Sequence, residues 1–112
     1  MKIYHNSRCS KSRQTLDIIN ANSWQVEIVE YLKTPVSKLE LQSLIKMLGI
    51  KAFDLIRKGE PIFKSEFKGK NLSEDQWVQA MVDHPKLIER PIVVNGNKAI
   101  IGRPPEKVLE LK

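Results

Sequence analysis

Cys9 is the residue of this 112-residue sequence whose type and position most favour nucleophilic chemistry. It follows an alternating polar and apolar segment at 2–5 and the turn residues Asn6 and Ser7, and a helical pattern begins at Ser10. A sulfur at a strand-to-helix turn faces free backbone N–H groups of the first helical turn, which stabilise a thiolate. The same N–H groups bind oxyanions, so this spacing predicts a nucleophile and an anion site at one place.

Arg8, Lys11 and Arg13 add positive charge close to Cys9 in the sequence. At an ordinary pKa of about 8.5, only about 3% of a cysteine is thiolate at neutral pH, and nearby cations favour the charged form. The alternative is an unreactive cysteine buried as a small apolar residue. A self-contained phosphatase-type loop is excluded, because Thr15 stands where its arginine would be.

A strand, a helix and a second strand are expected to position this cysteine. Leu16 and Ile19 lie on one helical face, and polar residues at 20–23 supply stop signals. Residues 24–32 are rich in Val, Ile and Tyr and predict the second strand. An opening of about 30 residues in this order predicts a right-handed parallel unit.

A helical block is predicted after the break at Pro35. Ser37 and Glu40 are typical of a capping box, Gly49 is expected to end that helix, and a further helical turn is expected at 52–57.

The second half of this block begins with a basic, irregular segment at 63–72, which is predicted to form an exposed loop. Ser73 and Gln76 form a second capping box before a helix that Pro85 closes, and Trp77 is expected in the core.

The last third of the chain predicts a β-hairpin followed by a short helix. Two apolar runs, 91–94 and 99–101, flank the turn residues 95–97, whose Asn-Gly pair suits a type I′ turn. The prolines at 104–105 fit the first turn of a terminal helix at 106–111.

The composition predicts one ordinary globular domain, with 41% hydrophobic and 29% charged residues. One cysteine and two separated histidines supply neither an internal disulfide nor the ligand spacing of a metal site. The net charge of +6 is scattered and aromatic residues are few, so nucleic-acid binding is not expected. No membrane-spanning run and no secretory signal is visible, which predicts a cytoplasmic protein.

Four separated segments carry a resemblance to a known family; they are His5 to Arg13, Leu55 to Lys58, Glu89 to Val94 and Ile101 to Glu106. In these segments the chain resembles the glutaredoxin-linked arsenate reductases of the ArsC/Spx family, and within it the YfgD-like bacterial members. The resemblance covers essentially the whole chain. It implies an α/β, thioredoxin-like fold, with a single domain over 1–112 and a helical insertion at about 34–86.

The resemblance also implies a role for individual residues. Cys9 matches the catalytic cysteine that attacks arsenate, and Arg57, Arg90 and Arg103 match the arginines that hold the oxyanion. Planar, permanently charged guanidinium groups suit bidentate contact with an oxyanion. Without the resemblance, each arginine would be interpreted as a solvated surface charge.

Three further positions match the family. His5 and Ser12 match residues that support the thiolate, and Pro91 matches a proline with a cis peptide bond beside the active cysteine. From the residues alone, His5 could simply cap or pack at a strand end, and Ser12 could be an ordinary first-turn residue.

The implied activity is the reduction of arsenate, or a similar oxyanion, through a Cys9 adduct that glutathione and glutaredoxin resolve. Glutathione is then a co-substrate, no cofactor is bound, and a monomer is expected. The alternative is a protein-binding regulatory module like those of the Spx branch, which usually carry Cys-x-x-Cys at this place. Ser12 stands where their second cysteine would be, which disfavours that redox switch but leaves a binding role open.

Overall fold

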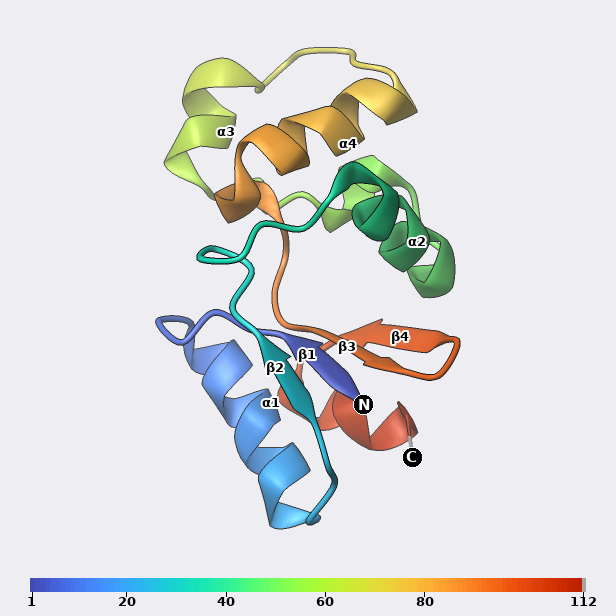
Figure 1. Cartoon of the computed structure of the whole chain (residues 1–112). Helices are drawn as coiled ribbons and strands as arrows, with labels where there is room; N and C mark the ends of the chain where they lie inside the picture. Colours follow the sequence, from blue (N-terminus) through green and yellow to red (C-terminus); the bar gives the residue numbers. More distant parts are fainter. Residues whose placement is uncertain (112) are drawn as a thin grey trace. The chain divides into compact units, whose positions relative to one another are not determined.

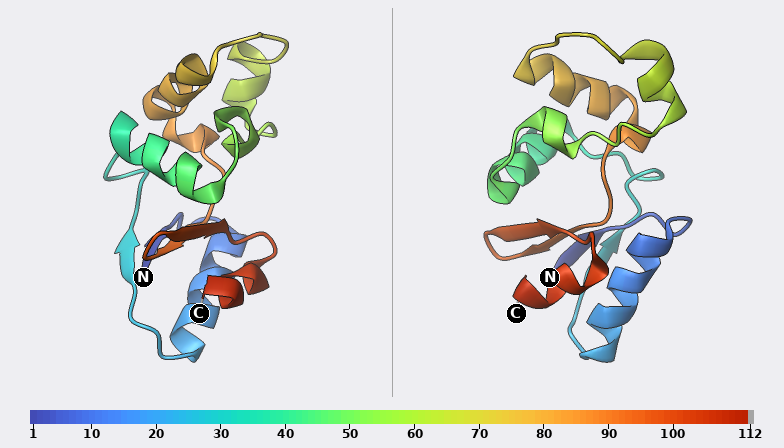
Figure 2. Two further views of the ribbon diagram at one scale, coloured as in Figure 1. Left: turned by 90° about the vertical axis from the view of Figure 1, so that its right-hand side faces the viewer. Right: turned by 180° about the vertical axis from the view of Figure 1, so that it is seen from behind.

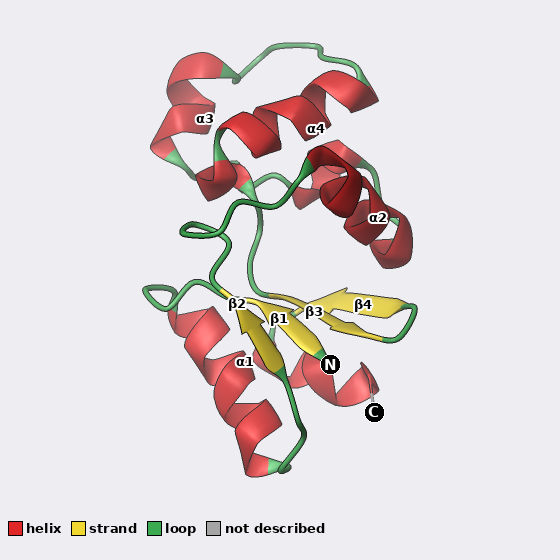
Figure 3. Cartoon of the chain, in the orientation of Figure 1, coloured by secondary structure: helices red, strands yellow, loops and turns green. Residues whose placement is uncertain are grey.

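The structure of the protein is a computed structural model that describes residues 1–111. The chain forms two compact units, one made of Met1–Thr34 together with the segment from Arg90 onward, the other of Pro35–Glu89. The strands belong to the first unit, whereas the regular elements of the second are helices (Figure 3). We call them the sheet unit and the helical unit.

The sheet unit is built on a four-stranded sheet in the order β2-β1-β3-β4, formed within residues 1–111 (Figure 1). β1 (Lys2–Tyr4) pairs in parallel with β2 (Glu27–Val29) and antiparallel with β3 (Ile92–Asn95), which pairs antiparallel with β4 (Lys98–Ile101). The helix α1 (Ser10–Ala21) connects the parallel pair, so the predicted strand, helix and strand opening is confirmed.

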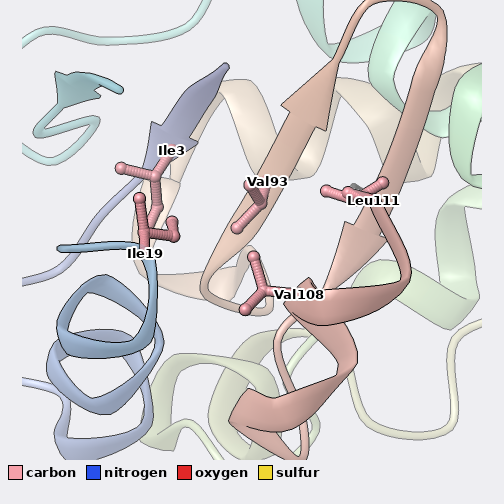
Figure 4. Close-up of a cluster of buried hydrophobic side chains, with 5 residues drawn as sticks. All are labelled: Ile3, Ile19, Val93, Val108 and Leu111. Atoms are coloured by element: carbon pink, nitrogen blue, oxygen red, sulfur yellow. The ribbon is translucent and has the colours of Figure 1, made fainter. Parts of the chain in front are cut away.

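The core of the sheet unit lies between the sheet and two helices, α1 and the 3₁₀ helix η3 (Pro105–Leu111), which lie on the same face of the sheet (Figure 2). Ile3 and Val93 are cross-strand partners and present neighbouring side chains to this face. They pack with Ile19 of α1 and with apolar side chains of η3, as Figure 4 shows.

The helical unit contains these elements: α2 (Lys38–Leu48), the 3₁₀ helix η1 (Ala52–Leu55), α3 (Pro61–Glu66), α4 (Glu74–Asp83) and the 3₁₀ helix η2 (Pro85–Leu87). Ser37 and Ser73 cap α2 and α4 as predicted, since each serine Oγ accepts from a backbone N–H three residues later. Gly49 ends α2 at a φ of +69°, a left-handed conformation that favours glycine.

The exposed loop predicted at 63–72 is wrong in its first part, because α3 extends to Glu66. Pro61 stands in the first turn of α3, where its missing N–H costs nothing. Phe63 is 7% exposed, and its ring stacks on Trp77 at a centroid distance of 6.4 Å. This contact between distant residues orders a segment whose local composition favours a loop.

Three local predictions also need correction. The second strand is Glu27–Val29, shorter than the predicted 24–32.

The turn of the hairpin also differs from the predicted type. Asn95 pairs with Lys98, so the central turn residues are Gly96 and Asn97. Of these two residues, only Gly96 has a positive φ. A type I′ turn needs positive φ at both, so this turn follows the type II′ pattern. The terminal helix lies where it was predicted but is a 3₁₀ helix.

Candidate active site

Cys9 is the N-cap residue of α1, with extended backbone at φ −93° and ψ 122°. Its backbone N–H donates to the carbonyl of Asn6 at 3.0 Å, and its own carbonyl accepts from the N–H of Arg13 at 3.0 Å. The turn after β1 therefore places the sulfur at the start of the helix, where the N–H groups of Lys11 and Ser12 face it.

Arg103 donates directly to the sulfur of Cys9. Its Nη2 donates to Cys9 Sγ at 3.3 Å, across 94 positions of sequence. Its Nε donates to the backbone carbonyl of Arg90 at 2.8 Å, which fixes the direction of the guanidinium plane. The Arg90 side chain is buried and also donates to the sulfur. Two arginines and one helix start thus converge on one thiol.

The β3–β4 hairpin explains why these two arginines meet. Ile92 pairs with Ile101, so Arg90 and Arg103 lie two residues beyond the same end of the hairpin. The peptide bond from Arg90 to Pro91 is cis, as the resemblance implies, and so is the bond from Arg103 to its following proline.

Gly102 is a residue of this site that the sequence did not reveal. Its N–H donates to the Pro91 carbonyl at 2.9 Å, while Thr15 Oγ1 of α1 lies against its Cα. A Cβ added here would come within 2.6 Å of Thr15 Oγ1 and 2.8 Å of Pro91 Cγ. Only glycine allows α1 and the hairpin end to approach this closely, and the approach determines where Arg103 lies.

The pKa of the Cys9 thiol lies below its ordinary value. Burial raises this pKa, but hydrogen bonds from the Ser12 N–H, the Arg90 side chain and the Lys11 N–H lower it, as does the charge of Arg103. The stabilising groups prevail, so the site favours the thiolate, which is the nucleophilic form.

His5 and Ser12 form a buried side-chain pair. His5 Nδ1 and Ser12 Oγ are 2.6 Å apart, and Ser12 Oγ also accepts from the N–H of Asn6 at 3.0 Å. Burial lowers the pKa of His5, the charge of Glu30 raises it, and that of Arg13 lowers it, with a net decrease. A neutral His5 therefore ties the end of β1 to the first turn of α1.

Arg57 belongs to the helical unit, whereas Cys9, Arg90 and Arg103 belong to the sheet unit. Its Nε is 3.7 Å from Glu60 Oε2 and its Nη1 is 3.8 Å from Glu89 Oε1. Its backbone N–H donates to the Leu87 carbonyl at 2.7 Å, which holds the Arg57 backbone in place. Its role toward an oxyanion stays a prediction.

This arrangement can bind a small oxyanion and attack its central atom. The guanidinium forks supply paired donors and permanent positive charge, and the thiolate supplies the nucleophile. Among residues 1–111, no group of three or more His, Cys, Asp or Glu side chains is arranged to hold a metal ion. Within the same range, every helix is too short or too polar to span a bilayer.

Comparison with known proteins gives a consistent result. The model of the ArsC family matches residues 4–111. The chain is 51% identical over 113 residues to the protein YfgD of Escherichia coli K12, covering 99% of this chain and 95% of that protein. It is 46% identical over 111 residues to an arsenate reductase of Haemophilus influenzae, covering 97% and 96% of the two chains.

The chain is also similar to solved structures. The structure of an arsenate reductase from Vibrio cholerae superposes with a TM-score of 0.95 and 43% identity, covering all of this chain and 98% of the other. The predicted fold class, α/β and thioredoxin-like, is confirmed by this similarity and by the mixed sheet.

Proposed function

The chain belongs to the ArsC family, and we propose that it is an arsenate reductase that works through a Cys9 adduct resolved by glutathione and glutaredoxin. The observation that carries the proposal is the 3.3 Å contact between Arg103 Nη2 and Cys9 Sγ, with the Arg90 side chain donating to the same sulfur. A thiolate bounded by two guanidinium groups is suited to attack an anion that would otherwise be repelled.

In the first step, the guanidinium groups bind the oxygens of arsenate, and the Cys9 thiolate attacks the arsenic atom. A sulfur–arsenic bond forms, and one arsenic–oxygen bond breaks with loss of water, after a proton transfer to the leaving oxygen. Arsenic remains in its pentavalent state. The Lys11 and Ser12 N–H groups, which face the thiolate, are free to donate to oxygens of the adduct once the sulfur is bonded.

In the second step, the thiolate of glutathione attacks the Cys9 sulfur. A sulfur–sulfur bond forms, the sulfur–arsenic bond breaks, and its electron pair stays on arsenic. Arsenic is thereby reduced to the trivalent state and leaves as arsenite after protonation, while two thiols are oxidised to a mixed disulfide. Each turnover thus moves two electrons from sulfur to arsenic.

In the third step, glutaredoxin attacks the mixed disulfide and releases the Cys9 thiolate. An external thiol is needed because Cys9 is the single cysteine of the sequence, and no second sulfur can resolve the bond internally. The proposed enzyme holds no cofactor, acts as a monomer and works in the cytoplasm, where glutathione is kept reduced.

We assign Arg57 as the third arginine of the proposed oxyanion site, from its match to the family motif. Glu60 and Glu89 pair with it at 3.7 and 3.8 Å, longer than a good charge-assisted hydrogen bond, so an arsenate oxygen can compete for the guanidinium.

A coupled assay tests the proposal. Arsenate-dependent NADPH oxidation is measured with glutathione, glutathione reductase and glutaredoxin, and the Cys9→Ser variant serves as the matched control. The proposal requires turnover by the wild type that the variant lacks. Turnover with thioredoxin and its reductase in the absence of glutathione would contradict the proposed route. Absence of arsenate-dependent turnover while Cys9 stays reactive would favour the protein-binding alternative.

A further inference from the structure

Residues of the sheet unit line a cavity of about 220 Å³. Four of them, residues 5–8, directly precede Cys9 in the sequence. One wall is the segment 5–8, which runs from the end of β1 into the catalytic turn. The other wall is formed by Glu30, Leu32 and Lys33, which follow β2. The wall 5–8 leads directly into Cys9, yet the cavity is lined by residues that the oxyanion chemistry above does not use, apart from His5.

The lining of this cavity combines one anion, two cations and an apolar surface. Glu30 supplies the carboxylate, Arg8 and Lys33 supply the positive charges, and Leu32 is 38% exposed. Glu30 and Lys33 pair with each other at 3.7 Å, with side chains that are 41% and 76% exposed. Exposed ion pairs of this kind are weak, so both groups can exchange partners with a ligand.

We propose that this cavity is the binding site of the incoming glutathione, an inference that rests on the proposed function. Glutathione carries one ammonium and two carboxylates, which match in number and sign the Glu30, Arg8 and Lys33 side chains. The cavity is smaller than the ~300 Å³ at which ligand pockets usually begin. It therefore holds the γ-glutamyl end, whose ammonium and carboxylate share one carbon, between Glu30 and Lys33.

The second carboxylate of the tripeptide then pairs with Arg8, the residue directly before Cys9. Because Arg8 and Cys9 are neighbours in the chain, this contact directs the ligand thiolate toward the Cys9 sulfur, where it forms the mixed disulfide as it displaces the bonded arsenic. None of the arginines assigned to arsenate lines this cavity, so the proposed site lets both substrates bind at once.

The test uses a reaction that needs no arsenate. The Cys9 thiolate attacks glutathione disulfide, forms the mixed disulfide and releases one glutathione thiolate, at a rate that mass spectrometry follows. The same reaction with uncharged 2-hydroxyethyl disulfide reports the intrinsic reactivity of Cys9. The ratio of the two rate constants thus isolates recognition of the tripeptide from any change in the pKa of the thiol.

Glu30→Gln is expected to lower this ratio about two- to fivefold, the range of an exposed charge pair. Glu27→Gln, an exposed residue of β2 outside the cavity, makes the same charge change and is the matched control. Both variants make the protein more positive, so general attraction of the anionic disulfide would raise the ratio in both. A decrease confined to Glu30→Gln is therefore specific to the cavity.

Lys33→Gln is expected to lower the ratio by a similar factor. Acetylation of the ligand ammonium should lower the ratio for the wild type but not for Glu30→Gln, because both changes remove the same contact. An unchanged ratio in Glu30→Gln and Lys33→Gln would overturn the inference even if arsenate is reduced. A decreased ratio without arsenate reduction would support the site and contradict the proposed function.

Discussion

The helices α4 and α1 both begin after a residue in extended backbone, but their first turns are stabilised differently. At α4, Ser73 Oγ accepts from the Gln76 N–H at 3.2 Å, and Gln76 Oε1 accepts from the Ser73 N–H at 2.9 Å. Glu74 and Asp75 add two negative charges next to the positive end of the helix. Every feature of this helix start stabilises the helix itself.

At α1 the N-cap is Cys9, and among residues 1–111 no side-chain hydrogen bond from it caps the helix and no acid stands in the first turn. The N–H groups of Lys11 and Ser12 face the sulfur, and Arg103 approaches it from the hairpin. The start of α1 thus lacks the groups that stabilise α4 and instead stabilises a negative charge on sulfur or on a bound oxyanion.

The largest effect is expected for Cys9→Ser. The hydroxyl does not ionise at neutral pH, so the adduct cannot form and arsenate reduction should fall to the background of the coupled assay. Far-UV circular dichroism should show an unchanged helix content, because serine is a preferred N-cap residue. Residual arsenate turnover well above background would mean that α1 does not carry the nucleophile.

The arginine that reaches into this helix start should also be essential. Arg103→Lys keeps the charge but removes the planar fork, so oxyanion binding should weaken by about 1.5–3 kcal/mol, the range for a charge-assisted hydrogen bond. Arg90→Lys and Arg57→Lys should act similarly. The measurement is protection of Cys9 from alkylation by arsenate or sulfate, with the unprotected rate as internal control. If arsenate or sulfate protected Cys9 in all three variants as well as in the wild type, these arginines would be ordinary surface charges that do not bind the oxyanion.

Gly102→Ala should disturb the start of α1 through packing. The added Cβ would overlap Thr15 Oγ1 and Pro91 Cγ, and an overpacked site of this kind costs about 1–3 kcal/mol of unfolding free energy. Gly59→Ala is the matched control, because a Cβ there meets nothing within 4 Å. Urea denaturation of both variants measures the difference. If Gly102→Ala and Gly59→Ala were equally stable, the hairpin end would have to move enough to accommodate the added Cβ without cost, which would contradict the prediction.

A smaller loss is expected when the cap of α4 is removed. Ser73→Ala deletes the oxygen that accepts from the Gln76 N–H, at a cost of about 1 kcal/mol in the free energy of unfolding. The reactivity of Cys9 should not change, since the bonds of this cap join Ser73 to Gln76 and involve none of the groups that lower the pKa of the Cys9 thiol. A change in the alkylation rate of Cys9 without a change in the free energy of unfolding would contradict the view that the start of α4 serves stability and the start of α1 serves chemistry.

The smallest effect concerns pH. The alkylation midpoint of Cys9 should lie below the ordinary value of about 8.5. Because its folded pKa is lowered, the thiolate contributes stability that is present above about 8.5 and is lost as pH falls through the folded pKa. In a Cys9→Ser background, Ser73→Cys offers a control thiol beside Glu74 and Asp75, and its midpoint should be higher. A Cys9 midpoint at or above that of the control would overturn the assignment.

The sequence predicted those features that local pattern controls. The helix starts at Ser10, Lys38 and Glu74 follow from capping residues and apolar spacing, and the hairpin follows from two apolar runs around Gly96. α3 was missed, because the burial of Phe63 against Trp77 depends on a distant residue.

The candidate site shows the same division between local and distant information. The role of Cys9 could be predicted from its neighbours in the sequence. Arg103 lies 94 residues away and could be assigned to the site only through the resemblance to a family. Gly102 was missed because its importance lies in a contact with Thr15 on another element. The charges around the cavity were missed because Glu30 and Lys33 are ordinary surface residues in sequence.

The hairpin register has a practical consequence for single-molecule work. Arg90 and Arg103 lie beyond the open end of the β3–β4 pair, whereas Gly96 and Asn97 turn at the closed end and are exposed. Ladder pairs from Asn95–Lys98 to Ile92–Ile101 separate the two ends. A fluorophore or surface tether joined at this turn would leave the spacing of the arginines intact, because exposed loop tips tolerate insertion. The hairpin thus provides a ready attachment point for observing thiol exchange on one immobilised molecule.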